Sequence, residues 1–271
     1  MNSSNRINSA FASLRADGRK GLLPYVTAGL PDLSTTLEVL TSLAELRVTA
    51  VELGFPYSDP IADGKTIQAS FTRALEHKIK VADILDMVRT FRKQHDLPLL
   101  GMLSYSIVHR VGVSKFVQQS RDAGLDGLIL PDLSLEEAES TAKLIGDAGL
   151  VMPMLVSPIS HADRRARIAK ISTGFIYYMS VTGITGERNE LPPELVENVR
   201  ELREQSGQPV VVGFGISTAD HVRRVCQAAD GAIIGSALVR RMMEEQDKNG
   251  NTRSIVKVVR EAVSEWITGT Q

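Results

Sequence analysis

The sequence predicts an α/β fold, and three observations lead to that class. Short apolar segments alternate about eight times with segments whose apolar residues recur at helical spacing. Uninterrupted apolar strands are typical of a parallel sheet covered by helices. The 271 residues also suit eight such units. We therefore predict a single domain, residues 1–271, folded as a (β/α)₈ TIM barrel with an extra N-terminal helix.

A doubly wound open sheet is the alternative arrangement of the same elements. It is disfavoured because residues 27–31, which follow the first apolar segment, lack the glycine spacing of a dinucleotide-binding turn. The strands are expected where aliphatic and β-branched residues run together between turn signals. In chain order they are residues 21–28, 49–53, 98–103, 127–130, 151–156, 175–179, 210–212 and 231–234.

The helices are expected between these strands, where apolar residues recur every three or four positions. Ile7, Phe11 and Leu14 indicate a docked helix at the N-terminus rather than a transit peptide. Asp32 is placed to cap the helix after the first strand, and Gly124 to end a later one. The remaining predicted helices are residues 66–76, 81–94, 114–123, 135–147, 163–171, 193–205, 218–228 and 254–266.

Composition excludes several classes of function. The net charge of −1 gives no support for a nucleic-acid partner or an acidic membrane surface. No apolar run approaches the roughly 18 residues needed to span a bilayer. A single cysteine, Cys226, excludes an internal disulfide framework and fits a reducing compartment. We therefore predict a cytoplasmic protein that acts on a small molecule.

The stretch after the second predicted strand, ELGFPYSDPIADG, carries two acids in unlike settings. Glu52 ends a buried strand, where desolvation would raise its pKa and let it act as an acid near neutral pH. Asp63 lies at the far side of a proline-rich loop, and it would stay ionised if it is more exposed to solvent than Glu52. Such a pair is a common acid/base arrangement. The ordinary alternative is that Asp63 caps the next helix and Glu52 is a strand-end charge.

Glycine-bearing segments follow the last three predicted strands, at the end of a barrel where active sites lie. A single glycine there can serve only a turn, but three converging segments let backbone N–H groups approach an anion closely. The last segment also opens a helix whose N-terminus favours negative charge. We therefore predict a phosphorylated substrate. The candidate phosphate-binding residues are Gly186, Gly213, Gly215, Gly235 and Ser236.

Other kinds of chemistry find no support in the sequence. The five histidines are scattered without metal-ligand spacing, so no metal site is predicted. No apparent strand carries a lysine that burial would activate for a Schiff base. Cleavage of a carbon–carbon bond here would have to proceed by acid/base catalysis alone.

The loop sequence ELGFPYSDPIADG, with the following Thr-Ile-Gln, closely resembles the signature of the tryptophan synthase α subunit family. The segments GITG at 183–186, GFGIS at 213–217 and GAIIGS at 231–236 resemble that family too. The resemblance runs from about Arg6 to the C-terminal helix, in order and without large gaps. One departure is Lys65, where the family usually has a proline; it leaves both acids in place but can loosen the loop that carries Asp63.

The resemblance implies the family's reaction, a retro-aldol cleavage of indole-3-glycerol phosphate to indole and glyceraldehyde 3-phosphate. By position, Glu52 resembles the proton donor and Asp63 the carboxylate that accepts the ring N–H. The family's assisting tyrosine matches Tyr177, although strand alternation alone does not choose between it and Tyr178. The residues that match the family's indole pocket are Tyr25, Leu103, Tyr105, Ile129 and Thr185.

The resemblance also implies a partner. The family's α subunit works in an α2β2 heterotetramer with a β subunit that carries pyridoxal phosphate and consumes the indole, so no cofactor is expected in this chain. Phe55 and Tyr57 are candidate interface anchors, and residues 183–192 a candidate lid. Three alternatives remain: another phosphate-binding barrel such as a sugar-phosphate isomerase, a non-catalytic barrel that only activates a partner, and a stand-alone indole-glycerol-phosphate lyase.

Overall fold

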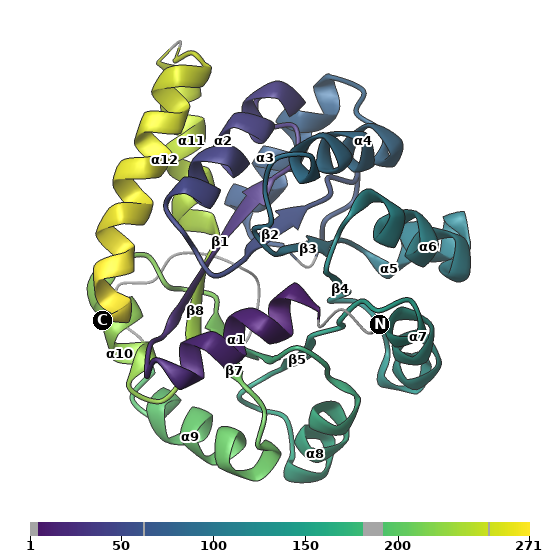
Figure 1. Cartoon of the computed structure of the whole chain (residues 1–271), viewed down its shortest axis with the longest axis vertical. Helices are drawn as coiled ribbons and strands as arrows, with labels where there is room; N and C mark the ends of the chain where they lie inside the picture. Colours follow the sequence, from purple (N-terminus) through teal and green to yellow (C-terminus); the bar gives the residue numbers. More distant parts are fainter. Residues whose placement is uncertain (1–4, 62, 181–191, 249) are drawn as a thin grey trace.

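The computed structural model describes residues 5–61, 63–180, 192–248 and 250–271, and it confirms the predicted barrel. Eight parallel strands form one sheet in the order β4-β3-β2-β1-β8-β7-β6-β5, and helices surround it (Figure 1). The strands are β1 (Gly21–Thr27), β2 (Val51–Gly54), β3 (Leu99–Met102), β4 (Gly127–Ile129), β5 (Met154–Val156), β6 (Ile176–Met179), β7 (Val210–Gly213) and β8 (Gly231–Ile234).

The helices follow the strands as predicted, with two additions. They are α1 (Arg6–Ala16), α2 (Leu33–Glu45), α3 (Lys65–Glu76), α4 (Val81–Arg92), α5 (Tyr105–Val111), α6 (Val113–Ala123), α7 (Leu135–Asp147), α8 (Ala162–Ile171), α9 (Leu195–Ser206), α10 (Ala219–Cys226), α11 (Ser236–Asp247), α12 (Thr252–Ile267) and the 3₁₀ turn η1 (Thr268–Thr270). Asp32 caps α2 by accepting a hydrogen bond from the Thr35 N–H. Neither α5 nor η1 was predicted.

Two differences from the predicted elements have local causes. The fifth strand begins at Met154 rather than Val151 because Pro153 has no N–H to donate to a ladder. The unpredicted α5 begins after Ser104, whose hydroxyl accepts a hydrogen bond from the Ser106 N–H. A serine in that position is an ordinary helix-start signal, so the sequence did contain it.

The strand ring closes between β4 and the segment just before β5. Gly127 and Val151 form a parallel bridge, and the Leu128 N–H donates to the Val151 carbonyl at 2.9 Å. Closure gives the barrel an inside and an outside, and the buried side chains divide accordingly. One cluster fills the interior, and a larger one lies between the strands and the helices.

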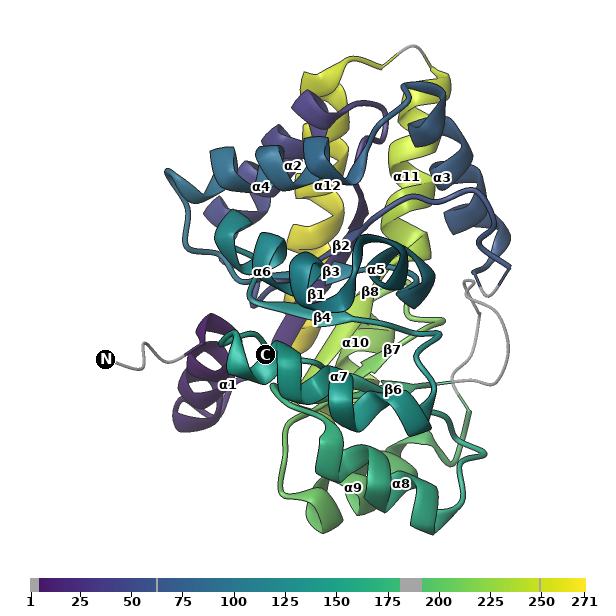
Figure 2. The same cartoon turned by 90° about the vertical axis from the view of Figure 1, so that its right-hand side faces the viewer.

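Helix α1 covers the end of the barrel at which the strands begin. Ile7 and Phe11 join the interior cluster, and the rings of Phe11 and Phe175 lie 5.5 Å apart. Figures 1 and 2 show α1 lying across this end, away from the loops that follow the strands. The predicted N-terminal helix is thus confirmed, and it lies at the opposite end of the barrel from the C-termini of the strands.

A buried carboxylate ties α1 to this end of the sheet. Asp126 is 3% exposed and accepts hydrogen bonds from Arg6 Nη1 at 3.0 Å, Arg92 Nη2 at 2.6 Å and the Leu99 N–H at 2.8 Å. The Asn5 side-chain amide also donates to the Asp126 carbonyl at 2.8 Å. Because a buried charge is costly unless it is paired, this network is a strong constraint on the fold.

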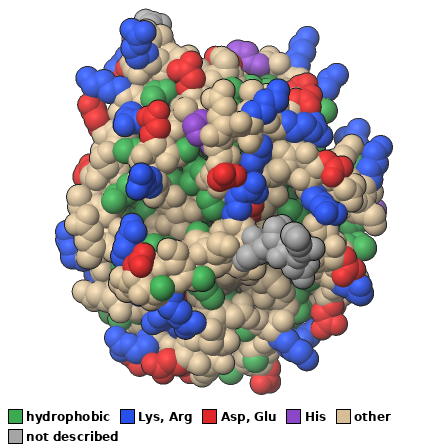
Figure 3. Space-filling model, in the orientation of Figure 1, with side chains coloured by type: hydrophobic (Ala, Val, Ile, Leu, Met, Phe, Trp, Pro, Cys, Tyr) green, Lys and Arg blue, Asp and Glu red, His purple; other side chains and the backbone are tan. Residues whose placement is uncertain are grey.

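Two observations bear on the classes of function. Acidic and basic side chains are interspersed over the face shown in Figure 3, as the small net charge predicts. Among the helices that the structure describes, none is both long and apolar enough to cross a membrane.

Candidate active site

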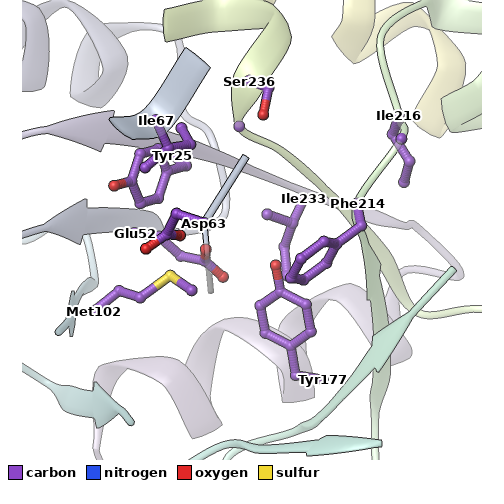
Figure 4. Close-up of a pocket in the computed structure, with 12 residues that line it drawn as sticks. Tyr25, Glu52, Asp63, Ile67, Met102, Tyr177, Phe214, Ile216, Ile233 and Ser236 are labelled. Atoms are coloured by element: carbon purple, nitrogen blue, oxygen red, sulfur yellow. The ribbon is translucent and has the colours of Figure 1, made fainter. Parts of the chain in front are cut away.

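A pocket opens at the C-terminal ends of the strands, where the sequence predicted the site. Figure 4 shows its lining from β1, β2, β3, β6 and β8 and from the loops after β2, β7 and β8. The lining residues are Tyr25, Glu52, Asp63, Ile67, Met102, Tyr177, Phe214, Gly215, Ile216, Ile233, Gly235 and Ser236. Three of them, Glu52, Asp63 and Tyr177, are the predicted catalytic residues.

Glu52 is a buried acid with no partner among the described residues. Its side chain lies next to the end of β2, the residue is 1% exposed, and neither carboxylate oxygen has a hydrogen-bond partner in the described part of the chain. Burial raises the pKa of this carboxyl from 4.5 to about 8. Glu52 therefore holds a proton at neutral pH and can give it to a bound molecule.

Asp63 faces the same pocket from the loop after β2. The Tyr57 hydroxyl donates to its Oδ2 at 3.3 Å, and Gln68 Nε2 donates to the carbonyls of Asp63 and Pro60 at 2.7 and 3.0 Å. These contacts tie the loop to α3. Burial raises the pKa of Asp63, while the hydrogen bond from Tyr57 opposes that change.

The ordinary explanation for Asp63 is not supported. Helix α3 is capped by Gly64, with no side-chain hydrogen bond at the cap, so Asp63 does not serve as the N-cap of that helix. Its carboxylate is directed into the pocket instead, beside Glu52 (Figure 4).

The structure chooses between the two tyrosines of β6. Tyr177 belongs to the barrel interior and lines the pocket, whereas Tyr178 packs outside with the helices. The Tyr177 ring stands edge-on to Phe214, with centroids 5.9 Å apart. A Cβ added at Gly213 would lie 2.3 Å from the Tyr177 hydroxyl oxygen. Gly213 thus leaves space for Tyr177 and is not itself part of the pocket lining.

Backbone atoms after β7 and β8 form another part of the pocket, the backbone corner. Phe214 and Gly215 both have positive φ, +73° and +74°, and the Ser180 hydroxyl donates to the Phe214 carbonyl. Gly235 caps α11 without a side-chain hydrogen bond, so the first turn of that helix, beginning at Ser236, faces the pocket. Backbone N–H groups at such a helix start attract an anion.

The predicted indole pocket is only partly brought together. Tyr25 lines the pocket, but Leu103 lies in the outer core, Tyr105 begins α5 half-buried, and Ile129 lies in the barrel interior. Thr185, Gly186 and the candidate lid up to residue 191 fall outside the described residues.

Sequence reasoning missed five apolar residues of the lining: Ile67, Met102, Phe214, Ile216 and Ile233. A signal existed for one of them. Side chains alternate along a strand, so an inward Leu100 places Met102 inward and Leu103 outward. The prediction for Phe55 as an interface anchor is wrong, because its side chain is fully buried in the core.

Comparison with known proteins gives a consistent result. The family model for the tryptophan synthase alpha chain matches residues 11–267. The tryptophan synthase alpha chain of Rhodopirellula baltica is 44% identical over 245 residues, which cover 89% of this chain and 88% of that one.

Solved structures agree with the sequence comparison. Subunit alpha of tryptophan synthase from Legionella pneumophila superposes with a TM-score of 0.90 at 34% identity, covering 98% of each chain. A chain of the tryptophan synthase complex from Pyrococcus furiosus gives a TM-score of 0.83 at 32% identity, covering 92% of this chain and 98% of that one.

The fold and the site together define a (β/α)₈ barrel with a pocket among the C-terminal ends of its strands, lined by two carboxylates. Within that class the match is specific. The chain belongs to the tryptophan synthase alpha chain family, and it is a lyase of tryptophan biosynthesis.

Proposed function

We propose that this pocket cleaves indole-3-glycerol phosphate into indole and glyceraldehyde 3-phosphate. The observation that carries the proposal is Glu52, a buried acid that has a pKa of about 8 and lies in one pocket with Asp63. Indole leaves poorly as a carbanion, so C3 of the ring must gain a proton before the carbon–carbon bond breaks. Glu52 is the group in the lining that can supply it.

The roles follow from where charge develops. Protonation of C3 by Glu52 makes an indolenine cation, whose charge is shared with the ring nitrogen, and Asp63 accepts the ring N–H and stabilises that cation. The substrate hydroxyl then loses its proton to the carboxylate of Glu52, the carbon–carbon bond breaks, and its electron pair neutralises the ring. The hydroxyl of Tyr177, which lines the same pocket, assists the reaction. Protons and electrons balance, so no cofactor is needed in this chain.

The phosphate would lie at the backbone corner. Gly235 leaves room for close approach, Gly215 lines the same corner, and the start of α11 at Ser236 supplies N–H groups. The apolar residues Ile67, Met102 and Phe214 would enclose the ring. A pocket that is apolar with a few directed polar groups is the usual design of a small-molecule site.

Indole release from indole-3-glycerol phosphate tests the proposal. Glu52→Gln keeps the shape of the side chain but cannot give a proton, so kcat should fall by about 10²–10⁴-fold or more. Glu38→Gln, a change at an exposed glutamate of α2, is the matched control and should be silent. In the wild type the rate should also decline above about pH 8, as Glu52 ionises. If the Glu52 variant kept more than about a tenth of the rate, general acid catalysis by Glu52 would be excluded.

We also propose that the chain docks on a tryptophan synthase β subunit, a pyridoxal-phosphate enzyme, in an α2β2 assembly. Ile61 and Ile159 support this: they are 87% and 75% exposed and lie on the loops after β2 and β5, at the active-site end of the barrel. They are the two most exposed large apolar side chains in the described part of the chain, and the buried centre of an interface is enriched in apolar contacts. Ile61 also lies two residues from Asp63, so docking there can adjust the site.

The partner proposal is tested by adding the β subunit. We expect it to raise lyase kcat by about tenfold or more, through placement of the Asp63 loop. Ile61→Asp should weaken both binding and activation, whereas Leu144→Asp, at a 39% exposed leucine on α7, should leave both unchanged. Full activity of the free chain, with no response to the β subunit, would instead favour a stand-alone lyase.

A further inference from the structure

A second cavity lies at the opposite end of the barrel from the active site. Its volume is about 230 Å³, and it opens between α1 and the starts of the last strands. Gly174 precedes β6, Pro209 precedes β7, and Asp230 precedes β8, and all three line it. Figure 1 views the molecule from this side, with α1 in front, and Figure 3 shows the surface of the same face. The cavity shares no residue with the pocket around Glu52.

One wall of this α1 cavity is apolar. Phe11, Leu14 and Pro209 line it, and Phe11 already stacks in a tilted geometry with Phe175 behind it. An aromatic ligand that packs against this wall would bury its apolar surface and contact the ring of Phe11. The volume is below the range of about 300–1,000 Å³ typical for drug-sized ligands, so the space fits a single ring with a short substituent.

The rim of the cavity is positively charged. Arg15 and Arg19 line it, are exposed, and form no ion pair with any acid in the part of the chain that the structure describes. The acid in the lining, Asp230, is already compensated, because its Oδ2 accepts hydrogen bonds from Arg203 Nε at 2.9 Å and the Val210 N–H at 3.0 Å. The net charge at the rim is therefore that of the two guanidinium groups. A guanidinium group can bind a carboxylate through two parallel hydrogen bonds.

We propose that the α1 cavity is a second ligand site, and that it takes a small aromatic carboxylate. The ring lies against Phe11, Leu14 and Pro209, and the carboxylate accepts hydrogen bonds from Arg15 and Arg19. This ligand differs in class from the proposed substrate. The α1 cavity offers two arginine side chains to a carboxylate, whereas the active-site pocket offers backbone N–H groups to a phosphate.

Titration calorimetry with 3-phenylpropionate on the full chain tests binding. We expect saturable binding with a Kd of about 1 mM or tighter, and binding at least about tenfold weaker for the neutral 3-phenylpropionamide. The double variant Arg15→Ala/Arg19→Ala should lose at least about tenfold in affinity for the acid. Arg164→Ala/Arg167→Ala, which removes two exposed arginines of α8, is the matched control and should bind as the wild type does.

Backbone amide resonances locate the bound probe. The amides of Gly174 and Asp230 should shift on titration, and those of Gly215 and Gly235 should not. Equal affinity for acid and amide, an unaffected Arg15/Arg19 variant, shifts confined to Gly215 and Gly235, or no saturable binding by about 10 mM would each overturn the proposal.

Discussion

Replacement of Glu52 by glutamine should raise the free energy of unfolding, relative to that of the wild type, by an amount that increases with pH. In the folded chain the pKa of Glu52 is about 8, against an ordinary value of 4.5, because the residue is buried, with 1% of it exposed. Below about pH 4.5 the group is protonated in both the folded and the unfolded state and does not distinguish them. Between 4.5 and about 8 the unfolded chain releases the proton while the folded chain keeps it, so rising pH favours unfolding.

The size of the effect follows from the shift. Each pH unit in this window costs about 1.4 kcal/mol, so the wild type loses about 3 kcal/mol between pH 5 and 7 and about 5 kcal/mol across the whole window. Glutamine does not ionise and escapes this loss. Its buried amide carries a desolvation cost of its own, but that cost is the same at every pH.

Urea denaturation at pH 5, 6, 7 and 8 measures the difference. The free energy of unfolding of Glu52→Gln, minus that of the wild type, should rise with pH by about 1.4 kcal/mol per unit and level off above about pH 8. For Glu38→Gln, at an exposed position, the same difference should be flat. A flat difference for Glu52→Gln would mean that the acid ionises as easily in the folded chain as in water. That result would remove the physical basis of its role as proton donor.

Three further substitutions test other parts of the site and the fold. Asp63→Asn should lower kcat by a larger factor than it raises KM, because the charge acts on the cation that forms in the transition state; a KM effect alone would indicate a positioning role. Gly213→Ala places a Cβ 2.3 Å from the Tyr177 hydroxyl oxygen and should reduce mainly kcat. A Cβ at Gly235 would instead meet Tyr25 at ordinary contact distances, 3.5 Å at the nearest, so Gly235→Ala should fold normally and raise mainly KM. Steady-state kinetics on both variants separate these effects, and equal losses would contradict the assignment. Asp126→Ala leaves Arg92, whose side chain is 10% exposed, without its acid, so it should cost about 3–5 kcal/mol in denaturation experiments; a cost below about 1 kcal/mol would show that the network is not a constraint on the fold.

The sequence alone determined the order of the elements and the end of the barrel at which the pocket around Glu52 lies. Strand and helix signals depend on residues a few positions apart, so the alternation, the Asp32 cap and the length of α7 followed from local pattern. The position of Glu52 at the end of the second strand was readable for the same reason. In a parallel barrel every strand ends at the same face, so local reading was enough to place Glu52 and Asp63 near each other.

The tertiary structure alone decided which faces of the elements are inside. Alternation puts Tyr177 and Tyr178 on opposite sides of β6, but only closure of the ring makes one of those sides the interior. Phe55 was misjudged as an anchor for the same reason, since its burial depends on elements distant in sequence. The role of Gly213 depends on a ring from the neighbouring strand, and the pKa of Glu52 depends on all the elements that exclude water from it. Contacts of this kind arise from packing between distant segments, and so they appear only once the chain is folded.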